Sequence, residues 1–146
     1  MRFLIIGLGS IGQRHYKNLR SLGFSNLAVY RTGKGNAEFA QKFEREYQPD
    51  VFHNSAEAFL TMPNAVFVAN PTALHAEFIS IALRNGVSGI FVEKPIGHKI
   101  PPIEAAVIAA EKKNIVGYVG YNLRFHPTLQ KMKKLVEDGL IGKVIS

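Results

Sequence analysis

The fold is decided by the stretch Arg2-Phe3-Leu4-Ile5-Ile6-Gly7-Leu8-Gly9-Ser10-Ile11-Gly12. It opens with a short, mostly apolar run, which predicts a strand over residues 2–6. The pattern G-x-G-x-x-G follows at once. Residues 10–22 then place Ile11, Tyr16 and Leu19 on one helical face, and Gly23 ends the helix. The sequence therefore predicts a strand, a glycine loop and a helix in direct succession.

This order gives the glycine pattern a chemical meaning. Gly7 permits a tight turn, Gly9 lets a diphosphate approach the backbone, and Gly12 lets the helix pack on the strand. The first helical residues, Ser10 and Ile11, offer free N–H groups at the positive end of the helix dipole. We expect these residues to bind a dinucleotide. A glycine turn without a ligand is the alternative.

The rest of the chain repeats the strand and helix alternation. We predict further strands over residues 27–30, 51–53, 65–69, 88–92 and 115–119, and helices over residues 36–47, 72–85, 101–114 and 127–138. Ser55 is predicted to cap a brief helix, and Thr72 the helix that begins there. The strands are apolar throughout, as strands covered on both faces are. The fold class is therefore α/β, a Rossmann-like doubly wound, mostly parallel sheet with helices on both faces.

Two segments are predicted to differ in their organisation. Residues 1–121 form the dinucleotide-binding domain, and residues 122–146 begin a second α/β domain that is incomplete. Residues 139–146 resemble the end of a helix followed by the start of a strand. Because nothing remains in the sequence to pair with that strand, we expect the chain to end at the start of the second domain.

Composition and charge narrow the function classes. Of 146 residues, 47% are hydrophobic and none is Cys, which excludes wholesale disorder, disulfides and thiolate metal sites, and no metal site is predicted. No apolar run approaches the about 20 residues of a membrane span, so we expect a soluble cytoplasmic protein with no membrane partner. The net charge of +7 favours an anionic partner. No long basic run or RNA-binding aromatic motif occurs, so a phosphorylated small molecule is preferred over nucleic acid.

The turn after the second strand bears on which dinucleotide binds. NAD binders place an Asp or Glu about 20 residues after the glycine loop, where it accepts hydrogen bonds from the ribose. Here the turn contains Arg31, Thr32 and Lys34, and no acid occurs between Ser25 and Ala37. We predict NADP over NAD, with Arg31 as the main anchor of the 2′-phosphate and Thr32 and Lys34 assisting. The alternative is that these are ordinary turn residues in an enzyme that uses either cofactor.

Further polar residues follow the later strands, at the edge where doubly wound sheets bind ligands. They are Asn70-Pro71-Thr72 with His75, then Glu93-Lys94-Pro95, then Gly120-Tyr121-Asn122-Leu123-Arg124-Phe125-His126-Pro127. Together with Gly7–His15, these pieces resemble the N-terminal half of the Gfo/Idh/MocA oxidoreductases, the family of glucose–fructose oxidoreductase and inositol dehydrogenase. They span nearly the whole chain in the family's order, and Glu-Lys-Pro is the most specific of them.

The resemblance implies an NAD(P)-dependent dehydrogenase that moves hydride between the nicotinamide and a hydroxyl carbon of a sugar, sugar derivative or polyol. It implies that Lys94 is catalytic, holding the substrate hydroxyl and assisting proton transfer, and that Pro95 follows a cis bond. It places the following residues at the cofactor: Asn70, Pro71, Thr72, His75, Glu93, Lys94, Asn122 and Arg124.

For His75, packing within its helix is the alternative, and His15 is expected to pack behind the glycine loop. The family's acidic residue and histidine lie beyond position 146, so we expect cofactor binding with little turnover. A homo-oligomer would form through the missing domain. A Rossmann module that senses NADP or another nucleotide without catalysis is the alternative function.

Overall fold

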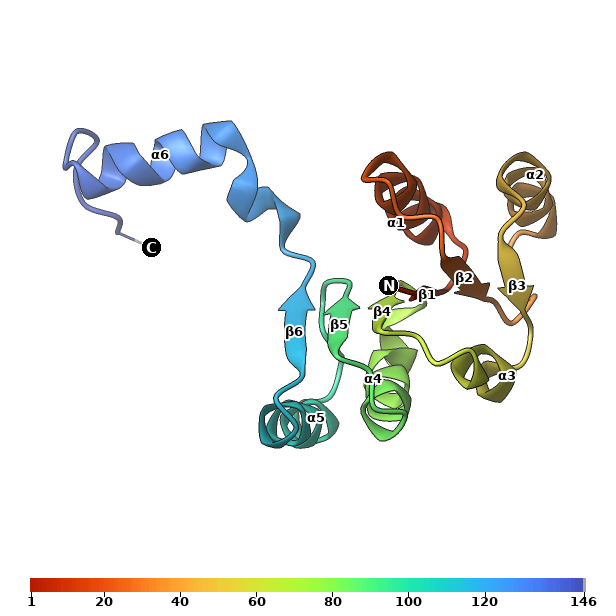
Figure 1. The fold of residues 1–146 in the computed structure, drawn as a ribbon. Helices are drawn as coiled ribbons and strands as arrows, with labels where there is room; N and C mark the ends of the chain where they lie inside the picture. The colour runs from red at the N-terminus through yellow and green to blue at the C-terminus, as the bar shows by residue number, and fades with distance from the viewer. Residues whose placement is uncertain (146) are drawn as a thin grey trace.

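Six parallel strands form one sheet in the order β3-β2-β1-β4-β5-β6 in the computed structural model, which describes residues 1–145 (Figure 1). The strands are β1 Phe3–Ile6, β2 Leu27–Tyr30, β3 Asp50–Phe52, β4 Ala65–Val68, β5 Gly89–Val92 and β6 Val116–Val119. The helices are α1 Ser10–Ser21, α2 Ala37–Tyr47, α3 Ser55–Leu60, α4 His75–Arg84, α5 Ile100–Lys112 and α6 Pro127–Glu137, with 3-10 turns η1 Thr72–Leu74 and η2 Asn122–Phe125. The predicted doubly wound α/β fold is confirmed.

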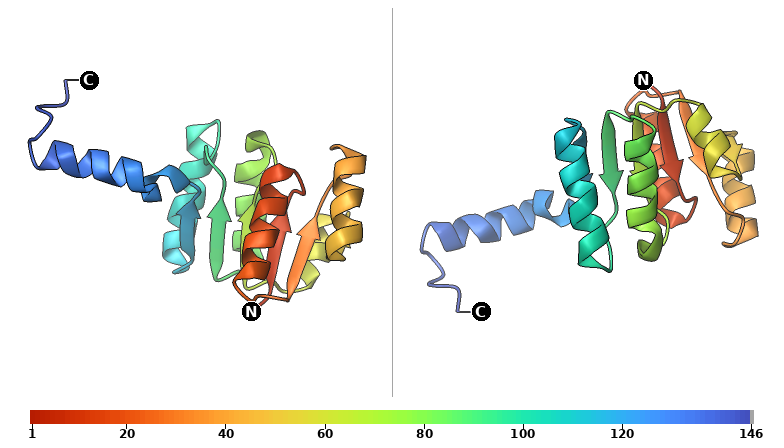
Figure 2. Two further views of the ribbon diagram at one scale, coloured as in Figure 1. Left: turned by 90° about the horizontal axis from the view of Figure 1, so that it is seen from above. Right: turned by 90° about the horizontal axis from the view of Figure 1, so that it is seen from below.

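Alternate residues of the central strands β1, β2 and β4 face two separate cores, whereas Val116 and Tyr118 of the edge strand β6 are exposed. Ile5 of β1 packs with Tyr16 of α1 and Phe43 of α2, whereas Leu4 and Ile6 pack toward α3, α4 and α5. The two views of Figure 2 show these two helix layers on opposite faces of the sheet. All four residues of β1 are buried, which explains why the strand sequence is apolar without alternation.

Three local predictions need correction. Asn54, not Ser55, caps α3, because its side-chain oxygen accepts from the backbone N–H groups of Ala56 and Glu57. Thr72 does not cap a helix: it begins η1 and makes no capping hydrogen bond, and the α-helix starts at His75. Residues 142–145 form no strand. A strand needs a hydrogen-bonded neighbour, and among residues 1–145 no strand pairs with this segment. Ser146 lies outside the described residues.

The chain after β6 leaves the body of the fold. α6 projects away from the sheet (Figures 1 and 2), and none of its residues is buried. Leu129 and Met132 are exposed on it. Among residues 1–145, no helix has the length and apolar character needed to cross a membrane. The boundary at residue 121 and the cytoplasmic location stay predictions.

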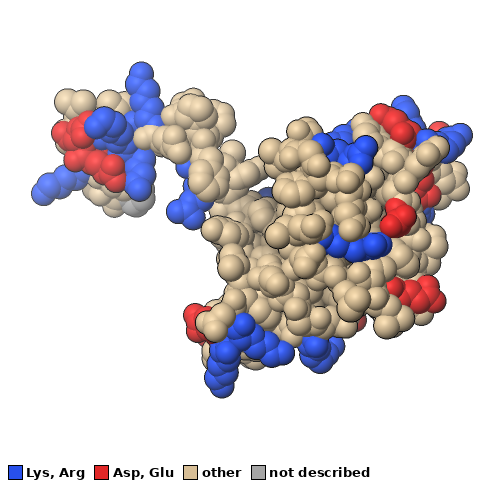
Figure 3. All heavy atoms as spheres, in the orientation of Figure 1, with Lys and Arg blue, Asp and Glu red and all other residues tan. Residues whose placement is uncertain are grey.

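Basic side chains do not merge into one surface on the face drawn in Figure 3. They are scattered over the body of the fold and gather on the projecting arm. There, two lysines pair with acids one turn further on, Lys133 with Glu137 at 3.5 Å and Lys134 with Asp138 at 3.2 Å. Exposed pairs of this kind contribute about 0.3–0.5 kcal/mol each.

Candidate functional site

The glycine loop joins β1 to α1 through two contacts that only glycine allows. Gly7 adopts φ +98°, and a Cβ there would lie 2.9 Å from the Ala69 carbonyl oxygen and from the Asn70 nitrogen. A Cβ on Gly12 would stand 1.9 Å from the Gly7 carbonyl oxygen. Gly9 differs, because nothing lies within 4 Å of a Cβ built on it. The loop is therefore closed by packing at its two ends and open in its middle.

The open part of the loop is the N-terminus of α1. Gly9 is the N-cap and has no side chain to satisfy the first N–H groups of the helix. Those groups belong to Ser10, Ile11 and Gly12, and they carry the positive end of the helix dipole. This arrangement suits an anion such as a diphosphate.

Gln13 holds the loop in place, a role that the sequence analysis missed. Its buried side-chain amide donates to the Leu8 carbonyl oxygen at 3.4 Å and to the Phe39 carbonyl oxygen at 3.3 Å. The first bond braces the loop, and the second ties it to α2. The available signal was a polar side chain three residues before Tyr16, on the face of α1 that turns inward.

Asn70 stands beside the loop, directly after β4. Its side-chain oxygen and nitrogen are both buried, and neither has a hydrogen-bond partner among the described residues. An unpartnered buried polar group costs about 1–3 kcal/mol, so this amide is suited to a ligand that supplies both an acceptor and a donor. Together with the open helix N-terminus, it makes the site fit an NAD(P) cofactor. Pro71 and Thr72 follow it in the same turn.

Glu93 follows β5, and its carboxylate has two polar partners. Its Oε1 lies 2.8 Å from His15 Nε2, and its Oε2 accepts from the Lys94 backbone N–H at 3.2 Å. A Cβ on Gly120 would lie 3.1 Å from both carboxylate oxygens, so this glycine leaves room for them. The carboxylate is thereby fixed between α1 and the ends of β5 and β6.

His15 does more than the packing predicted for it. Its ring lies against Phe67 and Phe91, at centroid distances of 5.3 and 5.0 Å, and its nitrogen reaches Glu93. The side chains of His15 and Glu93 are only 13% and 15% exposed, so solvent screens the pair little. The spacing of His15 four residues before the buried Leu19 was the signal for an inward-facing histidine.

Lys94 is exposed, in contrast to its neighbour Glu93. No hydrogen bond or ion pair holds its ammonium group among residues 1–145. The bond from Lys94 to Pro95 is cis, as the family resemblance implied. The ammonium group is therefore free to meet a second molecule at this edge of the sheet.

His75 is buried below the site, with 1% of its surface exposed. Its Nδ1 lies 2.9 Å from the Pro95 carbonyl oxygen, and its Nε2 lies 2.8 Å from the Asn70 carbonyl oxygen. A neutral imidazole carries one N–H, so one of these contacts is a hydrogen bond in each tautomer. Because both ring nitrogens face backbone, this placement favours a positioning role for His75, which links the turns after β4 and β5, over contact with a cofactor.

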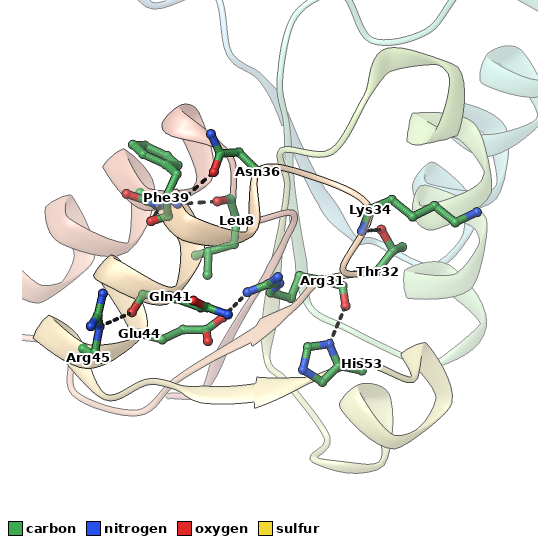
Figure 4. A network of polar contacts seen from close by, with 11 residues as sticks. Leu8, Arg31, Thr32, Lys34, Asn36, Phe39, Gln41, Glu44, Arg45 and His53 are labelled. Atoms are coloured by element: carbon green, nitrogen blue, oxygen red, sulfur yellow. Dashed lines mark hydrogen bonds and ion pairs between the residues drawn. The ribbon is translucent and has the colours of Figure 1, made fainter.

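The turn after β2 carries the residues predicted to bind a 2′-phosphate. Thr32 and Lys34 are exposed, and the Thr32 hydroxyl accepts from the Lys34 backbone N–H at 3.4 Å. Arg31 differs: its Nη1 lies 2.5 Å from Oε1 of Glu44 on α2 (Figure 4). Glu44 is not among the residues predicted from the sequence. The signal was its position four residues after the buried Ala40, on the helix face toward the sheet.

Asn122 and Arg124 lie on η2, between β6 and the projecting α6. Both are exposed, and the Arg124 guanidinium lies 5.7 Å from the centre of the Phe125 ring. The structure places them on the arm that leads away from the sheet, rather than on the turns that carry the other candidates.

Residues 1–121 match the family model described as an oxidoreductase family with an NAD-binding Rossmann fold. The chain belongs to this family, Gfo/Idh/MocA. It is 32% identical over 149 residues to scyllo-inositol 2-dehydrogenase (NAD(+)) of Bacillus subtilis, covering 99% of this chain and 42% of that protein. It is 27% identical over 145 residues to myo-inositol 2-dehydrogenase of Thermotoga maritima, covering 98% and 42%.

Solved structures agree with this assignment. Myo-inositol 2-dehydrogenase from Lactobacillus plantarum superposes with a TM-score of 0.85 at 26% identity, covering 99% of this chain and 43% of that one. Scyllo-inositol dehydrogenase from Lactobacillus casei, solved with bound NAD(H) and scyllo-inositol, has a TM-score of 0.79 at 26% identity, covering 97% and 42%. The chain thus spans about two fifths of the length of the relatives it matches.

The two glycines of the loop should separate folding from binding. Gly12→Ala forces a methyl group into the Gly7 carbonyl oxygen, so we expect unfolding free energy to fall by about 1–3 kcal/mol or more in urea titrations. Gly9→Ala meets no neighbour and should cost less than about 1 kcal/mol. It should nevertheless weaken cofactor binding, because its methyl group would stand where the sequence predicts that a diphosphate approaches the backbone. Equal stability of the two variants would contradict the packing role of Gly12.

The link between His15 and Glu93 should contribute to stability. His15→Phe keeps a ring against Phe67 and Phe91 but removes the partner of Glu93, so we expect a loss of about 1–3 kcal/mol at neutral pH. His15→Gln supplies another N–H donor and should lose less. Urea unfolding of both variants measures the difference. An unchanged unfolding free energy in His15→Phe would show that the contact with Glu93 contributes nothing.

Proposed function

We propose that this chain is the cofactor-binding part of an NAD(P)-dependent dehydrogenase acting on a hydroxyl carbon of a sugar, sugar derivative or polyol. The observation that carries the proposal is the meeting of three features at one edge of the sheet. They are the open N-terminus of α1, the unpartnered amide of Asn70, and Lys94 beside the fixed carboxylate of Glu93. The names of the inositol dehydrogenases among the relatives support the substrate class.

In this proposal, each part of the cofactor has its own group of residues. The backbone N–H groups of Ser10, Ile11 and Gly12 bind the diphosphate. The Asn70 amide binds further along the cofactor, with Pro71 and Thr72 lining it. Glu93 lies toward the nicotinamide end, held in one orientation by His15.

Lys94 performs the protein's part of the chemistry in this proposal. The nicotinamide supplies or accepts the hydride when bound. The Lys94 ammonium group donates a hydrogen bond to the substrate hydroxyl oxygen and assists the transfer of its proton. Asn122 and Arg124 contribute from the junction with the following segment. His75 keeps the turns after β4 and β5 together.

We further propose that NADP is preferred and that NAD remains usable. No carboxylate follows β2 at the position where NAD binders carry one, and Thr32 and Lys34 are exposed on the turn. The pairing of Arg31 with Glu44 opposes this preference, because it occupies the main candidate anchor.

Titration with reduced cofactor tests the proposal. We expect NADPH to bind this chain with a Kd in the micromolar range and more tightly than NADH. The fluorescence emission of the reduced nicotinamide measures both binding constants. Asn70→Ala should raise the Kd for NADPH and for NADH by about tenfold. The variant loses a buried hydrogen-bonding group, and tenfold corresponds to about 1.4 kcal/mol of binding free energy. Asn85→Ala, the same change at an exposed position after α4, is the control and should change affinity less than twofold.

The outcomes separate the parts of the proposal. No emission change at millimolar NADPH or NADH would contradict cofactor binding altogether. Binding of NADH as tightly as NADPH would contradict the preference alone. The role of Lys94 is tested in a form of the protein that turns over a polyol, where Lys94→Ala should lower kcat by about 100-fold or more. An unchanged kcat would contradict that role.

A further inference from the structure

The backbone of Arg31 is fixed from both sides. Its N–H donates to the Phe52 carbonyl oxygen at 3.0 Å, and its own carbonyl oxygen accepts from His53 Nδ1 at 3.1 Å (Figure 4). These two contacts hold the Arg31 backbone in place at the end of β2. With the backbone held, the direction of the side chain sets whether the guanidinium charge is available to a ligand at the end of β2.

Glu44 determines that position. Its carboxylate lies 2.5 Å from Arg31 Nη1, and the two side chains are 27% and 13% exposed. The adjacent Arg45 does not replace Arg31 as the partner of Glu44, since Arg45 Nε donates to the Gln41 carbonyl oxygen at 3.4 Å instead. Figure 4 shows the Arg31 side chain directed at α2, with Lys34 extending away from it.

The Arg31–Glu44 pair is therefore close to neutral, which leaves the exposed Lys34 as the cation on the turn after β2. A guanidinium and a carboxylate in contact nearly cancel at the distance of a ligand, and their partial burial limits screening by salt. A phosphate group on the adenosine ribose carries a charge of about −1.5 to −2. Glu44 would repel this phosphate and compete with it for Arg31. A ribose hydroxyl is uncharged and meets no such repulsion.

We propose that Glu44 is a specificity-determining residue, which competes with the 2′-phosphate of NADP for Arg31 and so limits the preference for NADP over NAD. This inference rests on the proposed function, because it concerns the same cofactor site. It makes a residue of α2, outside the turn after β2, responsible for part of the discrimination between NADP and NAD. Thr32 and Lys34 are the groups left free to meet the phosphate while Glu44 holds Arg31.

Glu44→Gln tests this assignment, because it keeps the shape of the side chain and removes its charge. We expect the Kd for NADPH to fall by about tenfold, a change of about 1.4 kcal/mol, and the Kd for NADH to change less than twofold. Glu46→Gln is the matched control: it makes the same charge change at an exposed position of the same helix. It should change both constants less than twofold.

A second variant guards against loss of folding in the first. Glu44→Asp keeps the charge and shortens the reach to Arg31, so NADPH should bind more tightly than to the unchanged chain but less tightly than to Glu44→Gln. Unfolding midpoints of all variants report whether they are folded.

Three results would overturn the inference. They are an NADPH Kd that does not fall in the folded Glu44 variants, an equal gain for NADH, and an equal gain in Glu46→Gln. If NADPH affinity falls instead, Glu44 orients Arg31 for the phosphate and the competition is refuted. If the unchanged chain binds neither cofactor, the proposed function fails together with this inference. Binding without an effect of Glu44 refutes this inference alone.

Discussion

The close approach of α1 to the end of β1 is the constraint on which the site depends. Gly12 lies so near the Gly7 carbonyl oxygen that a Cβ would stand 1.9 Å from it, and Gly7 in turn lies against the backbone of Asn70. These contacts bring the N-terminus of α1, the end of β1 and the end of β4 together. Because the strands are parallel and in register, the end of β5 with Glu93 and Lys94 falls at the same edge. The glycine contacts and the parallel register together align the groups proposed to bind a cofactor with the lysine proposed to act on substrate.

Two partly buried polar pairs, one at each end of the candidate site, hold side chains in place around the glycine loop. His15 of α1 fixes the Glu93 carboxylate at one end, and Glu44 of α2 holds the Arg31 guanidinium at the other. In both cases a helix supplies the partner for a residue just beyond a strand. The carboxylate of Glu93 is thereby oriented, whereas the guanidinium of Arg31 is occupied. A contact from a helix therefore orients a carboxylate at one end of the site and occupies a guanidinium at the other.

Much of the fold follows from short-range patterns in the sequence. Apolar runs mark the strands, glycines and prolines mark the ends of helices, and the repetition of both predicts the parallel sheet. The pairs missed in the site join residues far apart in sequence, 13 positions for Arg31 and Glu44 and 78 for His15 and Glu93. Only the folded backbone brings such residues together. Asn54 and Ser55 are equally good capping residues, so the sequence does not decide between them, and in the structure Asn54 is the cap. The strand expected near the C-terminus fails because a strand requires a neighbour.

A crystal structure of this chain with NADPH would test the central claim most directly. The account predicts the diphosphate at the N–H groups of residues 10–12 and the nicotinamide ring beside Lys94 and Glu93. A diphosphate bound away from the N-terminus of α1, or a ring that does not approach residues 93 and 94, would contradict it.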